Sequence, residues 1–129
     1  MKYRILIVSA NYYTDISNNL LKDAKTTLKS KAKYQIINVP GVFEIPVIIA
    51  KNIKKYDGFL ALGCVIKGET PHFDFISQAS IDAIMKLSIE NKKPIGNGII
   101  TSLNMKQAES RKDKGREAAK ALLSVLKIY

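Results

Sequence analysis

A run of twelve residues near the middle of the chain combines several groups that can do chemistry. The run L-G-C-V-I-K-G-E-T-P-H-F, residues 62–73, contains an apolar strand end, a glycine turn, a helix start and the only histidine. Gly68 permits a sharp turn, Thr70 can cap a helix, and Pro71 suits its first position. The spacing therefore predicts that His72 lies in the first turn of a helix.

The start of such a helix can bind an anion. Its first backbone N–H groups have no partner within the helix, and the helix dipole places positive charge there. A phosphate or carboxylate can therefore bind in the preceding turn. The same positive end favours the neutral imidazole of His72, which can then act as a general base near neutral pH. The alternative is that His72 is only a partly exposed residue of the first turn.

Elsewhere, the apolar pattern predicts strands that alternate with helices. The strands are expected at residues 4–10, 34–39, 59–66 and 95–100. The third of these is apolar enough to be buried on both faces. Such alternation is typical of a parallel sheet with right-handed crossovers. We therefore predict an α/β protein, a flavodoxin-like three-layer α/β/α sandwich with a four-stranded parallel sheet, in which residues 1–129 form a single domain.

The helix boundaries can also be predicted from local signals. Thr14 or Asp15 can cap the first helix, and Asn104 with Gln107 three residues later resembles a capping box for a short one. The last helix is expected after Gly115. Its inward face is predicted to hold Ala118, Ala119, Leu122, Val125 and Leu126.

Ligands of open parallel sheets bind beyond the carboxyl ends of the strands. This rule brings to one edge the aromatic Tyr12 and Tyr13 and residues 41–44, 64–72 and 97–101. The arrangement predicts an enzyme that acts on a planar or polyhydroxylated molecule together with a phosphorylated one.

These residues also have purely structural interpretations. Glu44 and Glu69 can simply stabilise the start of a following helix, because a negative charge there interacts favourably with the helix dipole. Tyr12 and Tyr13 can cover the end of the sheet instead of stacking on a ligand. Arg111, which with Lys114 could bind a phosphate, can equally be a solvated surface residue.

The composition is that of an ordinary globular domain of 129 residues, with 47% hydrophobic and 25% charged residues. No apolar run approaches the about 20 residues of a membrane span, and the first residues lack the layout of a signal peptide. We therefore expect a cytoplasmic protein. The single cysteine, Cys64, cannot form an internal disulfide or a zinc cluster and is expected to be a small buried strand residue.

The net charge of +10, from 21 basic and 11 acidic residues, suggests nucleic-acid binding as one alternative. The lysines are scattered along the chain, however, and no compact basic block is interleaved with aromatics. We interpret them mainly as solvated helix faces that also attract anionic substrates. A second alternative is a flavodoxin-like module that binds a flavin or nucleotide, which would not need His72.

Three motifs in this order and spacing resemble the 6,7-dimethyl-8-ribityllumazine synthase family: V-P-G-V-F-E-I-P at 39–46, L-G-C-V-I-K-G-E-T-P-H-F at 62–73 and Q-A-E-S-R at 107–111. The family condenses 5-amino-6-(D-ribitylamino)uracil with 3,4-dihydroxy-2-butanone 4-phosphate in the penultimate step of riboflavin synthesis. The resemblance implies this reaction, with no metal or cofactor, and no nucleic-acid or membrane partner.

The resemblance also implies roles for individual residues. His72 matches the residue that transfers protons. The ribitylaminouracil substrate would be bound by Tyr12, Val42, Phe43, Glu44, Cys64, Val65, Ile66 and Asn97. The phosphorylated substrate would be bound by Glu69, Thr70 and Arg111, with Lys114 as a possible phosphate contact.

The chain departs from the family pattern in several places. Asn11 replaces a frequent arginine, and Tyr12 replaces a phenylalanine, so that a shift of one residue would make Tyr13 the stacking ring. Asn97 takes a position that is often aromatic and that a neighbouring subunit contributes. The short segment 111–115 and the start of the chain close to the first strand favour a homopentamer, with sites between subunits, over a larger shell.

Overall fold

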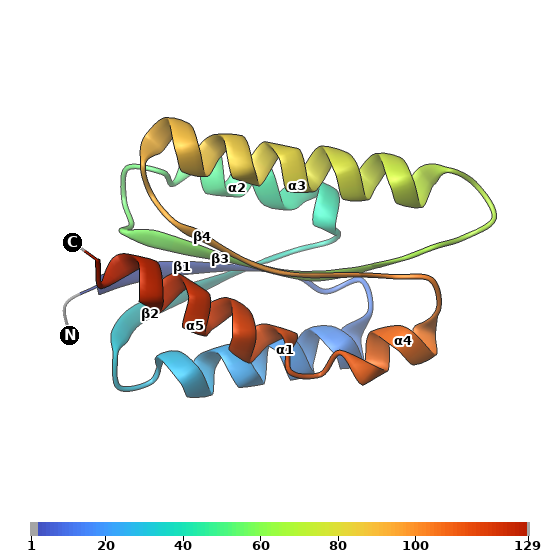
Figure 1. The fold of residues 1–129 in the computed structure, drawn as a ribbon, viewed down its shortest axis with the longest axis horizontal. Helices are drawn as coiled ribbons and strands as arrows, with labels where there is room; N and C mark the ends of the chain where they lie inside the picture. Colours follow the sequence, from blue (N-terminus) through green and yellow to red (C-terminus); the bar gives the residue numbers. More distant parts are fainter. Residues whose placement is uncertain (1–2, 129) are drawn as a thin grey trace.

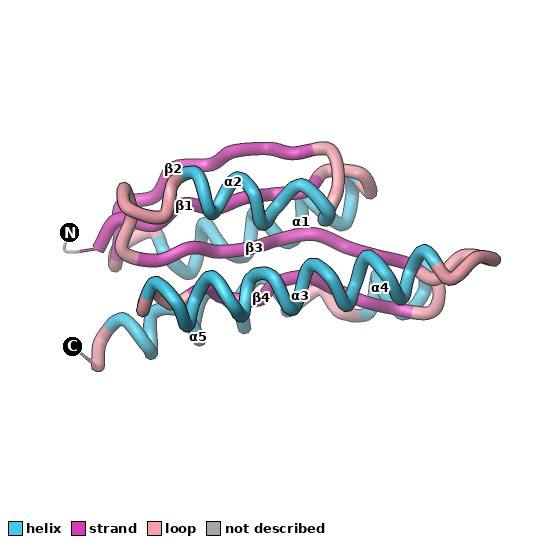
Figure 2. The backbone as a smooth tube through the Cα atoms, turned by 90° about the horizontal axis from the view of Figure 1, so that it is seen from above, coloured by secondary structure: helices cyan, strands magenta, loops and turns pink. Residues whose placement is uncertain are grey.

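The chain folds into a four-stranded parallel sheet between two layers of helices, in a computed structural model that describes residues 3–128 (Figure 1). The strands lie in the order β2-β1-β3-β4 (Figure 2). The elements are β1 (Tyr3–Ala10), α1 (Thr14–Leu28), β2 (Ala32–Val39), a 3-10 turn (Val42–Glu44), α2 (Ile45–Lys51), β3 (Gly58–Ile66), α3 (His72–Asn91), β4 (Ile95–Ser102), α4 (Met105–Ser110) and α5 (Lys114–Leu126).

The layers follow the predicted sandwich. Helices α2 and α3 cover one face of the sheet, and α1, α4 and α5 cover the other (Figure 1). The predicted α/β fold with a four-stranded parallel sheet is therefore confirmed. Among the described residues, no helix combines the length and the apolar character that crossing a bilayer requires.

The two central strands are buried on both faces, which explains their uninterrupted apolar sequences. Residues 5–8 of β1 and 59–62 of β3 have no exposed surface. Side chains alternate between the layers: Ile5 and Ile7 pack with α1 and α5, whereas Leu6 and Val8 pack with α2. The sheet is thus a rigid base for the loops that follow its strands.

Glycines allow α5 to approach its neighbours closely. A β-carbon on Gly96 in β4 would lie 2.7 Å from the carbonyl oxygen of Ala118. Gly115 was expected before the last helix but lies inside it, where a β-carbon would lie 2.4 Å from the carbonyl oxygen of Leu20. Since both contacts involve main-chain atoms, α5 packs closely against both β4 and α1.

The start of α1 differs from the prediction. The helix begins at Thr14, so Tyr13 takes the N-cap position, where it makes no side-chain capping bond. Neither Thr14 nor Asp15 is the cap, because both already lie within the helix. The entry to α1 is held instead by Ser17, whose buried hydroxyl donates to the carbonyl oxygen of Ala10 at 2.6 Å.

Helix α3 begins one residue later than expected. Pro71 takes the N-cap position and His72 is the first helical residue, so the predicted place of His72 in the first turn is confirmed. The hydroxyl oxygen of Thr70 accepts a long bond from the backbone N–H of His72, at 3.4 Å. The predicted cap of α4 is also present: Asn104 Oδ1 accepts from the backbone N–H of Gln107 at 2.9 Å, and Gln107 Oε1 accepts in return from the backbone N–H of Leu103, one residue before Asn104.

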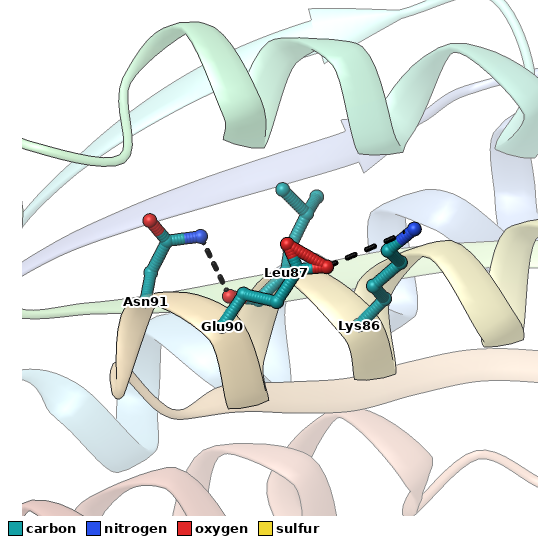
Figure 3. A network of polar contacts seen from close by, with 4 residues as sticks. All are labelled: Lys86, Leu87, Glu90 and Asn91. Atoms are coloured by element: carbon teal, nitrogen blue, oxygen red, sulfur yellow. Dashed lines mark hydrogen bonds and ion pairs between the residues drawn. The ribbon is translucent and has the colours of Figure 1, made fainter.

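Polar contacts within the last turns of α3 lie near its carboxyl end (Figure 3). The side-chain amide of Asn91 donates to the carbonyl oxygen of Leu87 at 2.9 Å, and Lys86 pairs with Glu90 at 3.8 Å. The prediction for the last helix was wrong at Val125, which is 48% exposed. It lines an open pocket together with Tyr3, Asp57 and residues between the end of α3 and the start of β4.

Candidate active site

A pocket of about 600 Å³ opens beyond the carboxyl ends of β1 and β3. Loops after three parallel strands reach it: the one after β1, the 3-10 turn after β2, and the end of β3 with the first turns of α3. The lining residues are Tyr12, Tyr13, Gly41, Val42, Phe43, Glu44, Cys64, Val65, Ile66, His72 and Ile76. The pocket thus combines segments that lie more than fifty positions apart in the chain.

The base of the pocket is the end of β3. Cys64 is buried there, and burial raises the pKa of its thiol to about 11, so the group is a neutral thiol at physiological pH. The prediction that Cys64 is a small buried strand residue is confirmed. Val65 and Ile66 are half-buried and leave the edges of their side chains open to the pocket.

The two tyrosines after β1 differ in their surroundings. Their rings meet edge to face, with centroids 4.9 Å apart and planes at 82°. Tyr13 packs against the core between α1 and the sheet, and burial raises its pKa, with further contributions from Cys64 and Tyr12. Tyr12 is 75% exposed. Tyr12 is therefore the ring whose surface is free to contact a ligand.

The turn after β2 supplies an acid and a second aromatic ring. Val42 is buried against the sheet and anchors the turn, whereas Phe43 is 62% exposed. Glu44 is half-buried, and its Oε1 lies 3.2 Å from the position that a β-carbon on Gly41 would take. A larger residue at position 41 would thus press on the carboxylate.

The histidine enters from the other side. His72 is exposed at the first position of the twenty-residue helix α3, with Ile76 one turn later on the same side of the helix. Ile76 was not among the predicted site residues. The spacing of four residues from His72 is the signal that could have placed it in the pocket.

Other predicted site residues lie outside this pocket. Glu69 and Thr70 are exposed in the turn before α3 but do not line it. Asn97 is the third residue of β4, beside Ala61 of β3, and its Oδ1 accepts from the backbone N–H of Ile99 at 3.0 Å. Asn97 therefore lies within the sheet, away from the carboxyl ends of the strands, where the ligand-binding residues were expected.

Arg111 and Lys114 lie on the opposite face of the sheet from α3. Arg111 is the exposed residue that ends α4, and Lys114 is the first residue of α5. Arg111 lines a separate small pocket of about 130 Å³, together with Asp15 and Glu109. Within one chain, the phosphate-binding candidates on this face are not brought to the pocket that holds His72.

The fold and this pocket define an α/β protein of the parallel-sheet class that binds a small molecule at the carboxyl ends of its strands, with a histidine and a carboxylate at hand. Among residues 3–128, no group of three or more His, Cys, Asp and Glu side chains is arranged to hold a metal ion.

Comparison with known proteins gives the family. The model of the 6,7-dimethyl-8-ribityllumazine synthase family matches residues 2–129. The chain is 44% identical to the 6,7-dimethyl-8-ribityllumazine synthase of Agrobacterium fabrum, over 98% of this chain and 95% of the relative. It is 48% identical to that of Bartonella henselae, over 97% and 87% of the two chains. The chain belongs to the 6,7-dimethyl-8-ribityllumazine synthase family.

Proposed function

We propose that this chain condenses 5-amino-6-(D-ribitylamino)uracil with 3,4-dihydroxy-2-butanone 4-phosphate to form 6,7-dimethyl-8-ribityllumazine, phosphate and water. The enzyme is a transferase of riboflavin biosynthesis. The observation that carries the proposal is the family match over nearly the whole chain. The pocket supports it with an aromatic ring, a carboxylate and a histidine at one edge of the sheet.

The pocket residues suit the planar, polyhydroxylated substrate. Tyr12 stacks on the pyrimidine, because its ring is exposed while that of Tyr13 is packed against the core. Val42, Phe43 and Glu44 bind the uracil substrate and its ribityl chain. The backbone at Cys64, Val65 and Ile66 contacts the same substrate from the end of β3.

His72 moves the protons that the reaction requires. The amine of the pyrimidine attacks the ketone, and loss of water gives an imine. Elimination of phosphate leaves an enol that tautomerises to a ketone. The ribitylamino nitrogen attacks this carbonyl, and loss of a second water completes the ring. Each step needs a proton added or removed at a fixed position, and a histidine at the edge of the pocket suits this task. Holding two reactants together supplies much of the remaining acceleration.

The phosphate group is bound by the turn before α3 and by basic residues of another copy of the chain. Glu69 and Thr70 lie beside the positive end of α3, where an anion is favoured. Arg111, with Lys114 near it, lies across the sheet from His72 in the same chain. We therefore assign Arg111, and likewise Asn97, to the site of a neighbouring subunit.

Exposed apolar surface along α2 and α3 supports such an assembly. The exposed side chains are Phe43 (62%) of the 3-10 turn before α2, and Val47 (55%), Phe75 (68%), Met85 (59%) and Ile89 (67%) of the two helices. Between the two helices lies an apolar groove of about 450 Å³. Large apolar patches of this kind are typical of interfaces. A homopentamer of single-domain chains in the cytoplasm, with active sites between copies, accords with this surface and with the family resemblance.

Mixing the purified protein with both substrates and following the absorbance of the lumazine tests the proposal. We expect the chromophore to appear only when both substrates are present. A protein that binds the uracil substrate or a flavin yet forms no lumazine would instead be a flavodoxin-like binding module. That result would overturn the proposed reaction.

A further inference from the structure

A second and larger cavity lies at the opposite edge of the sheet from the active site. Its volume is about 800 Å³, and its lining residues lie where β1 and β2 begin and in the connections that lead into β2 and β3. The lumazine reaction as proposed above uses none of its lining residues. The cavity is within the range of 300–1,000 Å³ that is usual for small-molecule sites.

The lining of this cavity is strongly basic. Five cationic side chains reach it from four segments of the chain: Arg4 of β1, Lys29 after α1, Lys33 of β2, and Lys54 and Lys55 before β3. None of the described residues that line it is acidic. We call this set of residues, with the cavity that they border, the basic cavity.

Among residues 3–128, none of these charged groups forms an ion pair. The ion pairs found within residues 3–128 involve other side chains, on α3 and α5. The acid nearest in the chain, Asp57, accepts a hydrogen bond from the backbone N–H of Arg4 at 2.8 Å, not from its guanidinium. Like charges around one opening repel one another, and a bound anion relieves that repulsion.

Structural roles account for only part of this cluster. Lys29 is the C-cap of α1, where a cation complements the helix dipole. Lys33 lies on the edge strand β2, where lysine discourages pairing with other chains. Lys54 and Lys55, however, follow the end of α2 by three and four residues and cap no helix. Neither role explains why all of them border one cavity.

The remaining wall is aromatic and ordered. Tyr34 and Tyr56 are half-buried there, and the Tyr56 hydroxyl donates to Oε1 of Gln35. The ring of Tyr56 also packs edge to face on Phe59, with centroids 6.0 Å apart. The wall is therefore held in place before any ligand binds, which lowers the entropic cost of binding.

We propose that the basic cavity binds a small molecule that carries a polyphosphate chain. Lysine ammonium groups and the Arg4 guanidinium would contact the phosphate oxygens, and the tyrosine wall would cover an attached ring. A nucleoside triphosphate and an inorganic polyphosphate share this chemistry. The cavity lies at the far edge of the sheet, so such a ligand leaves the active-site pocket free.

Titration calorimetry with inorganic tripolyphosphate and, separately, with ATP tests this assignment. We expect saturable binding of tripolyphosphate that weakens as salt is added. The variant Lys33→Gln/Lys54→Gln/Lys55→Gln keeps polar side chains at these exposed positions and should bind at least about tenfold more weakly, since three charges are lost from one site. Tighter binding of ATP than of tripolyphosphate would show that the ring contributes.

A matched control removes the same charge elsewhere. Lys22, Lys106 and Lys120 are exposed and do not line the basic cavity, so Lys22→Gln/Lys106→Gln/Lys120→Gln should bind tripolyphosphate as the unmodified protein does. Arg111→Ala should also leave binding intact. Equal weakening in the control, loss of binding in Arg111→Ala, or no saturable binding of tripolyphosphate would each overturn the proposal. So would tighter binding of a single-stranded oligonucleotide, because the cavity would then be part of a nucleic-acid surface.

Discussion

Gly115 of α5 lies directly against the main chain of Leu20 in α1. A β-carbon at position 115 would be 2.4 Å from the Leu20 carbonyl oxygen and 3.1 Å from its Cα. Atoms of a helix backbone cannot turn aside as the end of a side chain can. The contact fixes the distance between α1 and α5, and with it the position of the segment that joins Arg111 to α5.

Gly115→Ala should therefore destabilise the protein. Alanine in a helix gains about 0.5–1 kcal/mol over glycine, but overpacking a tight contact costs about 1–3 kcal/mol. We expect the cost of the clash to exceed the gain in helix propensity, so that the free energy of unfolding in urea falls by about 1–2 kcal/mol. Ser124→Ala, at an exposed position of the same helix, should change it by less than about 0.5 kcal/mol. A more stable Gly115→Ala protein would show that α1 and α5 can separate freely.

His72→Ala should slow lumazine formation while leaving the uracil substrate bound. Loss of a general acid or base typically costs about a hundredfold or more in rate. Steady-state kinetics should thus show a lower kcat with little change in KM for the uracil substrate. Lys86→Gln, on an exposed turn of the same helix, should turn over normally. Unchanged kcat in His72→Ala would remove the histidine from the mechanism.

Two inactive variants should restore activity when they assemble together. If a site takes His72 from one copy and Arg111 from a neighbour, a random mixture of His72→Ala and Arg111→Ala chains leaves about a quarter of the sites with both residues intact. Turnover should therefore reappear after the variants are unfolded together and reassembled. Each variant refolded alone is the control. No recovery in the mixture would mean that both residues serve the same copy.

The buried thiol of Cys64 should make stability fall at high pH. Its pKa is about 11 in the folded chain and about 9.0 when exposed, so the folded state binds its proton more tightly. The stabilisation is complete below pH 9 and is lost as pH rises toward 11. Urea unfolding at several pH values should show a steeper decline for the unmodified protein than for Cys64→Ala. Equal declines would mean that the thiol is not desolvated.

An acidic residue in the apolar groove should prevent assembly. Val47 is 55% exposed beside the groove between α2 and α3, and burying an aspartate there on assembly would be unfavourable. Light scattering should show smaller particles for Val47→Asp than for the unmodified protein. Val125→Asp, at an exposed valine on the other side of the sheet, is the control and should assemble normally. Unchanged assembly of Val47→Asp would place the interface elsewhere.

The fold could be predicted largely because its signals are local and strong. An apolar run such as residues 59–62 has no stable place except between two layers, and the observed strand is buried there on both faces. The capping box of Asn104 and Gln107 was predictable because both of its partners lie within one turn. The start of α1 was not, since Thr14 and Asp15 lie inside the helix and the observed contact at its start is a bond from Ser17 back to the preceding strand, which no local signal predicts.

Only the part of the site that follows directly from the sheet topology could be predicted. Glu44 and His72 share a pocket because parallel strands end at the same edge of the sheet. The place of Arg111 was not predictable, because the face on which α4 packs depends on the path of the chain after β4. Asn97 was expected at the carboxyl edge although it is the third residue of the predicted strand 95–100. The observed strand runs on to Ser102, so Asn97 lies five residues before its carboxyl end.

Helices α1 and α5 pack together although they lie near opposite ends of the chain, so α1 is synthesised well before its partner. During synthesis on a ribosome, Ile16, Leu20 and Ala24 emerge about a hundred residues before Ala118 and Leu122, which pack against them in the folded protein. A nascent chain in which the pocket loops have already formed therefore still exposes the apolar face of α1. We expect the nascent protein to depend on chaperones until α5 has left the ribosome.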